Sequence, residues 1–230
     1  MMTFMILFRK YFLILLLFIY SFPVASEGKY FVKELKNNDG SRWVIEKENE
    51  GYNLKYVDSK GEGYNNRGVI TSDVGEDNIL LINDSPESVS VLMTYTRDNY
   101  VFKFSSGEIP NLLSACKQIK LPSVNNDQAV SLLMLCVKNS VIYNLTLSNM
   151  DADKLLASDN LELSDKVKTI IGTNKAFLYD DNKVQYTRKP YLIKGDVIEV
   201  LDYENSFLKV RYITRSKRDV IGWVRFEDIL

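Results

Sequence analysis

Apolar and polar positions alternate in short runs along most of the chain, which is the pattern of antiparallel strands. Residues 42–46 and 52–57 (RWVIE and YNLKYV) flank a charged turn and predict a hairpin. Residues 90–96 and 100–104 flank a second polar turn and predict another hairpin. The period of two in these runs gives each strand one face for a core and one face for solvent.

Two other runs extend the predicted sheet. Asn78–Ile82 (NILLI) is short and mostly apolar, and predicts a buried strand. Ser90–Met93 is followed 41 residues later by the similar run Ser131–Met134, and a polar turn at Lys138–Ser140 then leads to Ile142-Tyr143. This spacing is close to that of a propeller blade, but two copies cannot close a propeller. We therefore expect two similar hairpins in one sheet, with coincidence as the alternative.

Two segments predict short helices. Pro110–Ile119 begins with a proline suited to a first helical turn, and its apolar side chains follow at roughly helical spacing. These side chains are Leu112, Leu113, Cys116 and Ile119. Asp151–Ala157 (DADKLLA) has acidic residues at its start and good helix formers after them.

The chain therefore divides into a β-rich domain and a smaller C-terminal module. The periodic pattern fades after the second helix, and we place a linker at residues 159–173. It separates an N-terminal antiparallel β-sheet domain, residues 27–158, with one or two short helices, from residues 174–230, where the strand pattern resumes. The fold class expected is mainly β.

The first 26 residues have the pattern of a secretory signal peptide. Arg9 and Lys10 precede the apolar run Tyr11–Phe22, and Pro23–Ser26 supplies small residues for cleavage. An uncleaved anchor is the alternative, but the 15 residues from Tyr11 to Ala25 fall short of the ~20 that a spanning helix needs. We expect a periplasmic or secreted protein, soluble after cleavage, that meets the membrane only through the signal segment.

Composition removes several classes of function. The 230 residues include no histidine, which excludes histidine-based acid–base catalysis, Ser/His or Cys/His nucleophile pairs and most zinc sites. Lys and Arg total 29 against 30 for Asp and Glu, so no strong field exists to attract nucleic acid. The apolar fraction of 46% is typical of a folded protein with a core.

The two cysteines, Cys116 and Cys136, predict a structural disulfide. An exported chain folds in an oxidising compartment, and the pair has neither CxxC spacing nor a third ligand type nearby. Closing a loop of about 20 residues stabilises a fold by roughly 3 kcal/mol in the chain-entropy model. A catalytic thiol would need a base, and the chain has no histidine to serve as one.

Other chemistry is weakly indicated. The glycines of Gly61–Gly68 (GEGYNNRG) lie between hairpins without the strand-to-helix setting of a phosphate loop. Asp151 and Asp153 lack the remaining ligands and the glycine of a calcium loop. We expect no metal, no cofactor and no catalytic residues. A glycosidase needs only two carboxylates, so a cell-wall hydrolase is kept as an alternative.

The C-terminal module resembles a bacterial SH3 domain. The resemblance consists of AFLY at 176–179, YLIKGDVIEVL at 191–201, FLKVRY at 207–212 and IGWVR at 221–225, followed by EDIL at the end. Its most specific parts are the Lys-Gly-Asp turn, whose Gly195 permits a positive φ, and the Gly-Trp-Val strand. The chain departs from the family at Ser206-Phe207, where Gly-Trp is common, and in a long basic loop at 214–219.

The resemblance implies a small β-barrel that binds cell-wall peptides or other proteins through aromatic side chains in a groove. Candidate groove residues are Tyr179, Tyr191, Tyr203, Phe207 and Trp223. Packing in the barrel core is the alternative role for each of them, and it is favoured for Trp223. Phe207 alternates with Leu208, which places its side chain on the outward face of the strand.

These observations together favour an exported binding protein that is not an enzyme. Its partner is expected to be peptidoglycan or another exported protein, and nucleic acid is not expected. A more specific alternative is an immunity or inhibitor protein that neutralises a toxin in the periplasm. From Asn174 onward the chain has 11 basic and 9 acidic residues, which leaves 16 against 21 in residues 27–173. This acidic balance would suit a basic toxin surface.

Overall fold

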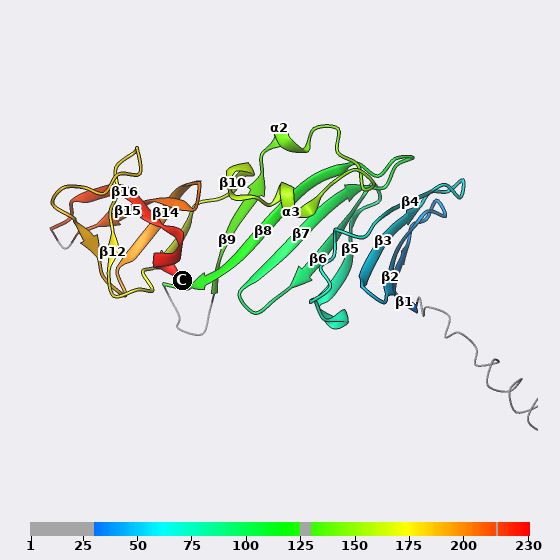
Figure 1. The fold of residues 1–230 in the computed structure, drawn as a ribbon, viewed down its shortest axis with the longest axis horizontal. Coiled ribbons are helices and arrows are strands. Elements are labelled where there is room, and N and C mark those ends of the chain that lie inside the picture. Colours follow the sequence, from blue (N-terminus) through cyan, green and yellow to red (C-terminus); the bar gives the residue numbers. More distant parts are fainter. Residues whose placement is uncertain (1–29, 125–129, 215) are drawn as a thin grey trace, which may run out of the picture.

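The computed structural model describes residues 30–124, 130–214 and 216–230, and the expected signal peptide lies outside these ranges. The fold is mainly β, as predicted, and every strand pair among the described residues is antiparallel. Figure 1 shows a four-stranded N-terminal sheet, a central six-stranded sheet and a C-terminal unit arranged along the long axis of the molecule.

The N-terminal sheet has its four strands in sequence order. They are β1 (Tyr30–Lys36), β2 (Arg42–Glu48), β3 (Gly51–Val57) and β4 (Gly63–Asn66). The predicted first hairpin is confirmed as β2–β3, with Trp43 opposite Tyr56. Both rings are buried, and the Trp43 ring lies 5.4 Å from that of Phe104 in the next sheet. This contact joins the cores of the two sheets.

The central sheet contains the second predicted hairpin, which is confirmed as β6–β7. Its strands, in spatial order, are β10 (Leu161–Leu163), β9 (Val130–Val137), β8 (Leu112–Pro122), β7 (Asp98–Ser105), β6 (Ser88–Thr94) and β5 (Ile79–Ser85). One face is buried, with Met93, Phe102 and Leu135 among its side chains. We call this the core-facing side of the sheet.

The helix predicted over Pro110–Ile119 is wrong, because most of this segment belongs to β8. The strand pairs with β7 on one side and β9 on the other, so its backbone groups are satisfied in the ladder. The register shifts between Lys103 and Phe104, which places one extra residue on β8. Leu112 and Ala115 therefore both lie on the core-facing side although they are three residues apart. This irregularity gives these two buried residues of β8 a spacing of three, which resembles the spacing of apolar residues in a helix.

Two expectations about individual strands also need correction. β5 does contain NILLI residues, but it is an edge strand, and Leu80 and Ile82 are 41% and 39% exposed. The second copy of the repeat is not a hairpin: Ser131–Met134 lies in β9, and the turn after it forms α2 (Asn139–Ile142). Ile142 is buried, so packing of this side chain replaces the strand pairing that was expected.

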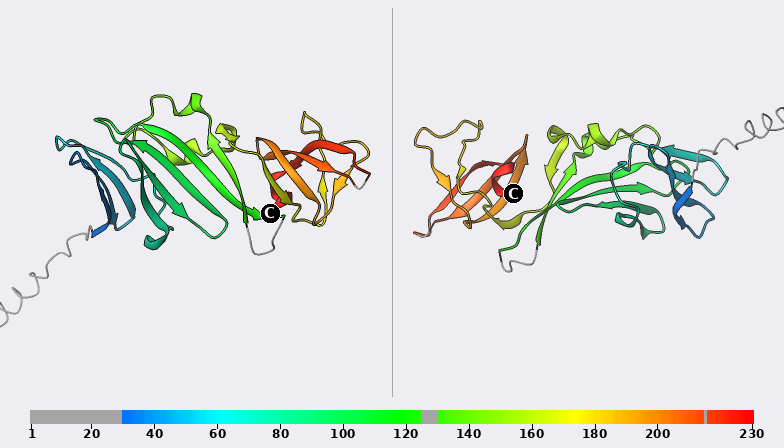
Figure 2. Two further views of the ribbon diagram at one scale, coloured as in Figure 1. Left: turned by 180° about the vertical axis from the view of Figure 1, so that it is seen from behind. Right: turned by 60° about the horizontal axis from the view of Figure 1, so that its bottom comes forward.

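The second predicted helix is confirmed as the short α3 (Ala152–Leu155). The Asp151 side chain caps it by accepting a hydrogen bond from the Lys154 backbone N–H at 3.2 Å. Ala152 and Leu155 are buried, and α3 lies on the core-facing side of the central sheet (Figures 1 and 2). Two 3₁₀ turns, η1 (Glu76–Asn78) and η2 (Ser158–Asn160), precede β5 and β10.

The C-terminal unit contains a four-stranded and a two-stranded sheet. The larger sheet has the order β11 (Val167–Ile170), β14 (Val197–Glu204), β15 (Phe207–Ile213) and β16 (Asp219–Arg225). The smaller pairs β12 (Ala176–Phe177) with β13 (Tyr191–Leu192), and η3 (Phe226–Ile229) ends the chain. Leu208 and Val210 are buried while Phe207 and Lys209 face outward, and Gly195 has the positive φ (+88°) that its turn requires.

The expected linker, residues 159–173, contains two strands. β10 completes the central sheet by pairing with β9, and β11 pairs with β14 in the C-terminal unit. The Thr169 hydroxyl donates a hydrogen bond to the Pro122 carbonyl at 3.0 Å, which ties β11 to the end of β8. The two parts of the chain are therefore joined by paired strands on each side of residues 164–166.

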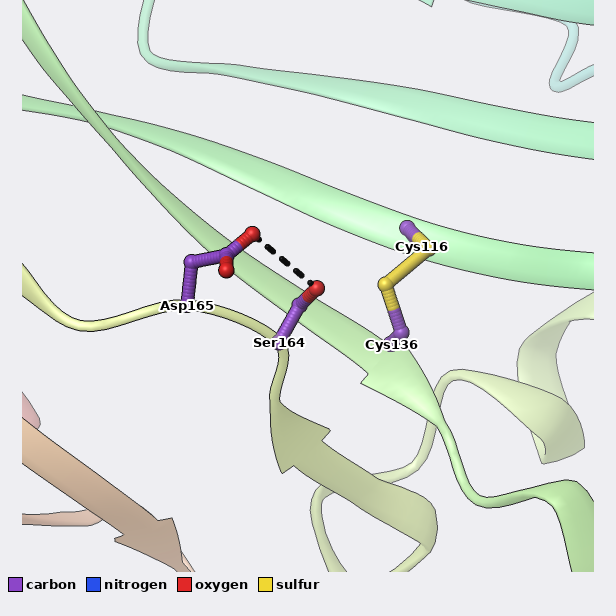
Figure 3. The surroundings of a disulfide bond; sticks show 4 residues. All are labelled: Cys116, Cys136, Ser164 and Asp165. Atoms are coloured by element: carbon purple, nitrogen blue, oxygen red, sulfur yellow. Dashed lines mark hydrogen bonds between the residues drawn. A yellow bond between two sulfur atoms is a disulfide. The ribbon is translucent and has the colours of Figure 1, made fainter.

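The predicted disulfide is confirmed. Cys116 of β8 and Cys136 of β9 lie directly opposite each other, with their Cα atoms 4.0 Å apart (Figure 3). They lie on the side of the sheet opposite the core-facing side, because Ala115 and Leu135 next to them point inward. Ser164 and Asp165, just after β10, lie close to this bond in the same view.

Within the described ranges, no helix is long and apolar enough to cross a membrane.

Candidate functional site

Three of the five candidate aromatic residues meet on the outward face of the C-terminal unit. Phe207 pairs with Arg225 and Lys209 with Trp223 across β15 and β16, so these four side chains share one face of the sheet. Tyr179 follows β12 and forms an isolated bridge with Trp223, with two backbone hydrogen bonds of 2.8 and 2.9 Å. The Tyr179 and Phe207 rings then meet edge to face, with centroids 5.2 Å apart.

Trp223 forms the floor of this surface and is only 4% exposed. The residues that cover it come from the turn after Tyr179. Its indole N–H donates to an Asp181 carboxylate oxygen at 3.0 Å, and the Lys183 ammonium lies 3.5 Å from the centroid of its ring. The Trp223 ring is therefore covered by this turn and is not free to stack on a ligand.

The accessible part of the surface combines two aromatic rings with two cations. We define the aromatic surface as Tyr179, Phe207, Lys209 and Arg225. The Arg225 guanidinium lies 5.7 Å from the centroid of the Tyr179 ring and pairs with Glu227 at 3.2 Å. The Lys209 ammonium lies 3.1 Å from an Asp181 carboxylate oxygen.

Electrostatics hold the covering turn in place. Hydrogen bonds from the Trp223 indole and then from Lys209 lower the pKa of the Asp181 carboxyl below its ordinary value. A hydrogen bond from Lys183, which lies 2.6 Å away, likewise lowers the pKa of Glu204. Both carboxylates therefore stay ionised at neutral pH and keep the two lysines beside the Trp223 ring.

The other two candidates do not belong to the aromatic surface. Tyr191 is 48% exposed and packs against Phe177 at 6.2 Å, with the Lys175 ammonium 4.4 Å from the centroid of its ring. Tyr203 is buried and meets the Phe226 ring edge to face at 6.5 Å. Tyr203 is thus a core residue, and Tyr191 belongs to a second aromatic cluster.

Sequence reasoning missed the charged members of the surface. Arg225 belongs to the IGWVR strand but was not a candidate site residue, although its pairing partner Phe207 was one. Asp181 and Lys183 lie in a polar turn with no periodicity, and nothing in the sequence places that turn over Trp223. Only the bridge between Tyr179 and Trp223 brings the turn to this face.

The arrangement is suited to binding by contact and charge. Aromatic rings offer apolar faces for sugar rings or apolar side chains, while arginine and lysine side chains pair with carboxylates. No group of three acidic or cysteine side chains that could hold a metal ion occurs in the part of the chain that the structure describes.

Comparisons with protein-family models, with curated proteins and with solved structures found no match for this chain.

Proposed function

We propose that this chain is an exported, non-enzymatic binding protein whose C-terminal unit is an SH3-like domain that recognises cell-wall material. The observation that supports it is the aromatic surface, in which the Tyr179–Phe207 pair lies beside the Arg225 guanidinium. The expected signal peptide and the Cys116–Cys136 disulfide favour an exported location.

Cell-wall peptidoglycan has the chemistry that this surface would accept. Its sugar rings and peptide methyl groups can pack on the Tyr179 and Phe207 rings, and its peptide carboxylates can pair with Arg225 and Lys209. Burying one such ring contributes about 1.5–3 kcal/mol of apolar transfer free energy. A single aromatic side chain can therefore account for a large share of the affinity.

The test is co-sedimentation of the mature protein with purified peptidoglycan. Phe207→Ala is expected to abolish co-sedimentation, because it removes one ring of the pair without opening the core. Tyr143→Ala is the matched control for loss of an exposed aromatic side chain, since Tyr143 follows α2, which packs on β8 of the central sheet, and is 77% exposed. A circular dichroism spectrum and an unfolding curve establish that each variant is folded.

The variant Tyr191→Ala distinguishes the two aromatic clusters of the C-terminal unit. Unchanged co-sedimentation of this variant, together with its loss in Phe207→Ala, locates recognition at the aromatic surface. Loss in Tyr191→Ala alone moves the site to the cluster of Lys175, Phe177 and Tyr191. If purified cell wall is hydrolysed during the assay, the non-enzymatic part of the proposal is wrong.

A second candidate function is recognition of another exported protein, with neutralisation of a periplasmic toxin as its most specific form. It is favoured by the acidic balance of residues 27–173, which hold 16 basic and 21 acidic side chains. Complementary charge speeds association with a basic partner and discriminates against others. Absence of co-sedimentation with peptidoglycan, together with tight one-to-one binding to a toxin encoded nearby, would establish this function in place of the first.

A further inference from the structure

A cavity of about 440 Å³ opens on the core-facing side of the central sheet, away from the aromatic surface. It lies between the β6–β7 turn, β8 and α3. Buried Met93 and Phe102 form part of its floor, and Ala152 and Leu156 of the α3 region line one wall. Pockets of this size are typical of small-molecule or side-chain binding sites.

Two tyrosine rings line the cavity in fixed positions. The Tyr95 and Tyr100 rings meet edge to face, with centroids 5.6 Å apart and planes at 88°. The Tyr95 hydroxyl hydrogen-bonds with the Thr71 hydroxyl and lies 3.5 Å from an Asp73 oxygen. The Tyr100 hydroxyl donates to Asp98 at 3.2 Å. Because both hydroxyls are held, the two rings are preorganised as one part of the cavity lining.

The charged groups at the cavity leave an excess of negative charge. Asp73, Asp98 and Asp153 line it, and Lys117 is the one basic residue among its lining. Lys117 pairs with Asp98 at 3.0 Å. Over residues 30–124, 130–214 and 216–230, neither Asp73 nor Asp153 forms an ion pair. Two carboxylates therefore remain without a cation at the edge of an aromatic cavity.

Lys117 shows that this environment favours an ammonium group. Its Nζ lies 5.3 Å from the centroid of the Tyr100 ring, which is within the range of a cation–π contact. Burial opposes the charge on Lys117, but hydrogen bonds with Asp98 and Tyr100 outweigh it and raise the pKa of the ammonium above its ordinary value. A second cation would find the same kinds of partner in Tyr95 and in the two unpaired carboxylates.

We propose that this cavity binds an organic cation, an alkylammonium or guanidinium group, against Tyr95 and Tyr100 with Asp73 and Asp153 as counter-ions. A metal ion fits less well, because no three acidic or cysteine side chains within the described ranges come together as ligands. The cation can belong to a small molecule or to a lysine or arginine side chain of a partner. The proposal stands on residues of the central sheet and does not depend on the function proposed for the C-terminal unit.

The test is an NMR titration that follows the ring signals of Tyr95 and Tyr100. The small probes are putrescine and ethylguanidinium, and the third is a short peptide with one arginine and blocked ends. If putrescine or ethylguanidinium binds at least as tightly as the peptide, the cavity is a small-molecule site. Binding of the peptide alone indicates a partner side chain. Either result supports the proposal, and no ring shift with any of the three probes overturns it.

Variants test the charges directly. The double variant Asp73→Asn/Asp153→Asn is expected to weaken binding about tenfold, the combined effect of two exposed ion pairs. Asp159→Asn removes an exposed carboxylate outside the cavity and should leave the affinity unchanged. Equal affinity of the double variant and the unmodified protein would overturn the proposal.

Lys117→Gln provides a test with the opposite sign. It removes the cation that competes for Asp98 and Tyr100, so the affinity for each bound probe is expected to rise severalfold. A variant that had merely loosened its fold would bind more weakly, so damage to the fold cannot mimic this result. Unchanged or weaker binding by Lys117→Gln would contradict the assignment of the cavity as a cation site.

Discussion

Removing the disulfide between β8 and β9 is expected to cost about 3 kcal/mol of unfolding free energy. Cys116 and Cys136 are 20 residues apart in the sequence. In the chain-entropy model, a cross-link that closes a loop of this length raises the free energy of the unfolded chain by about 3 kcal/mol. The strand pairing continues from Lys117–Leu135 to Pro122–Val130, so the ladder persists without the covalent bond. Most of the cost therefore arises because the unfolded chain gains freedom.

The measurement compares urea unfolding of the unmodified protein with that of Cys116→Ser/Cys136→Ser. The chain has two tryptophans, and Trp43 is fully buried where the N-terminal sheet meets the central sheet. Its fluorescence, in proteins that also carry Trp223→Phe, therefore follows unfolding of the part that contains the disulfide. With a slope of about 2 kcal/mol per molar urea, the midpoint is expected to fall by roughly 1.5 M.

Reduction of the unmodified protein is the control for the serine substitutions. The reduced protein should unfold at the same midpoint as the double variant, because both lack only the cross-link. A shift of less than about 0.5 M would refute the loop-entropy reasoning. A midpoint for the double variant far below that of the reduced protein would instead assign the loss to the serine hydroxyls.

Three other outcomes depend on single contacts. Gly172→Ala should lower the thermal midpoint of unfolding much more than Gly222→Ala. An added Cβ would lie 2.7 Å from a backbone oxygen at Gly172 but 3.3 Å from a leucine methyl at Gly222, so equal effects would contradict this reasoning. The indole N–H signal of Trp223 should shift with a midpoint below pH 3.8, because the folded state lowers the pKa of Asp181, its hydrogen-bond partner. The contact therefore stabilises the fold above pH 3.8, and this contribution is lost as the pH falls through the lowered pKa. A midpoint at or above pH 3.8 would disprove the coupling. Phe104→Ala should cost about 3–5 kcal/mol in urea unfolding, since the ring is fully buried, and a loss below about 1 kcal/mol would show that the core closes over the space.

Local pattern was sufficient for the first two hairpins, β2–β3 and β6–β7, and for the outward direction of Phe207. Both depend on the period of two within one strand, which any sheet imposes on its residues. It was insufficient for β8, because the extra residue opposite Lys103 and Phe104 changes which side chains face the core. It was also insufficient for β5, whose apolar residues lie at the edge of the sheet, where one of the two flanking strands is missing.

The candidate site was predictable only in part. Tyr179 and Phe207 were candidates from the resemblance to a bacterial SH3 domain, but the same reasoning included Tyr203, which packs in the core against Phe226. The same aromatic residue types occur in such a module whether they face a ligand or the interior. Their burial depends on which strands they pair with, and that is a property of the folded unit.

The amino-acid sequence by itself determined the mainly β class, the first two hairpins, the short helix after Asp151 and the disulfide between Cys116 and Cys136. These features depend on local periodicity, on one capping residue and on an even number of cysteines, all of which can be read along the chain. Only the tertiary structure decided that Tyr95, Lys117 and Asp153 share a cavity, and that a polar turn covers Trp223. These groups come from segments far apart in the chain, and their distances are set by strand register and packing between sheets, which no local pattern contains.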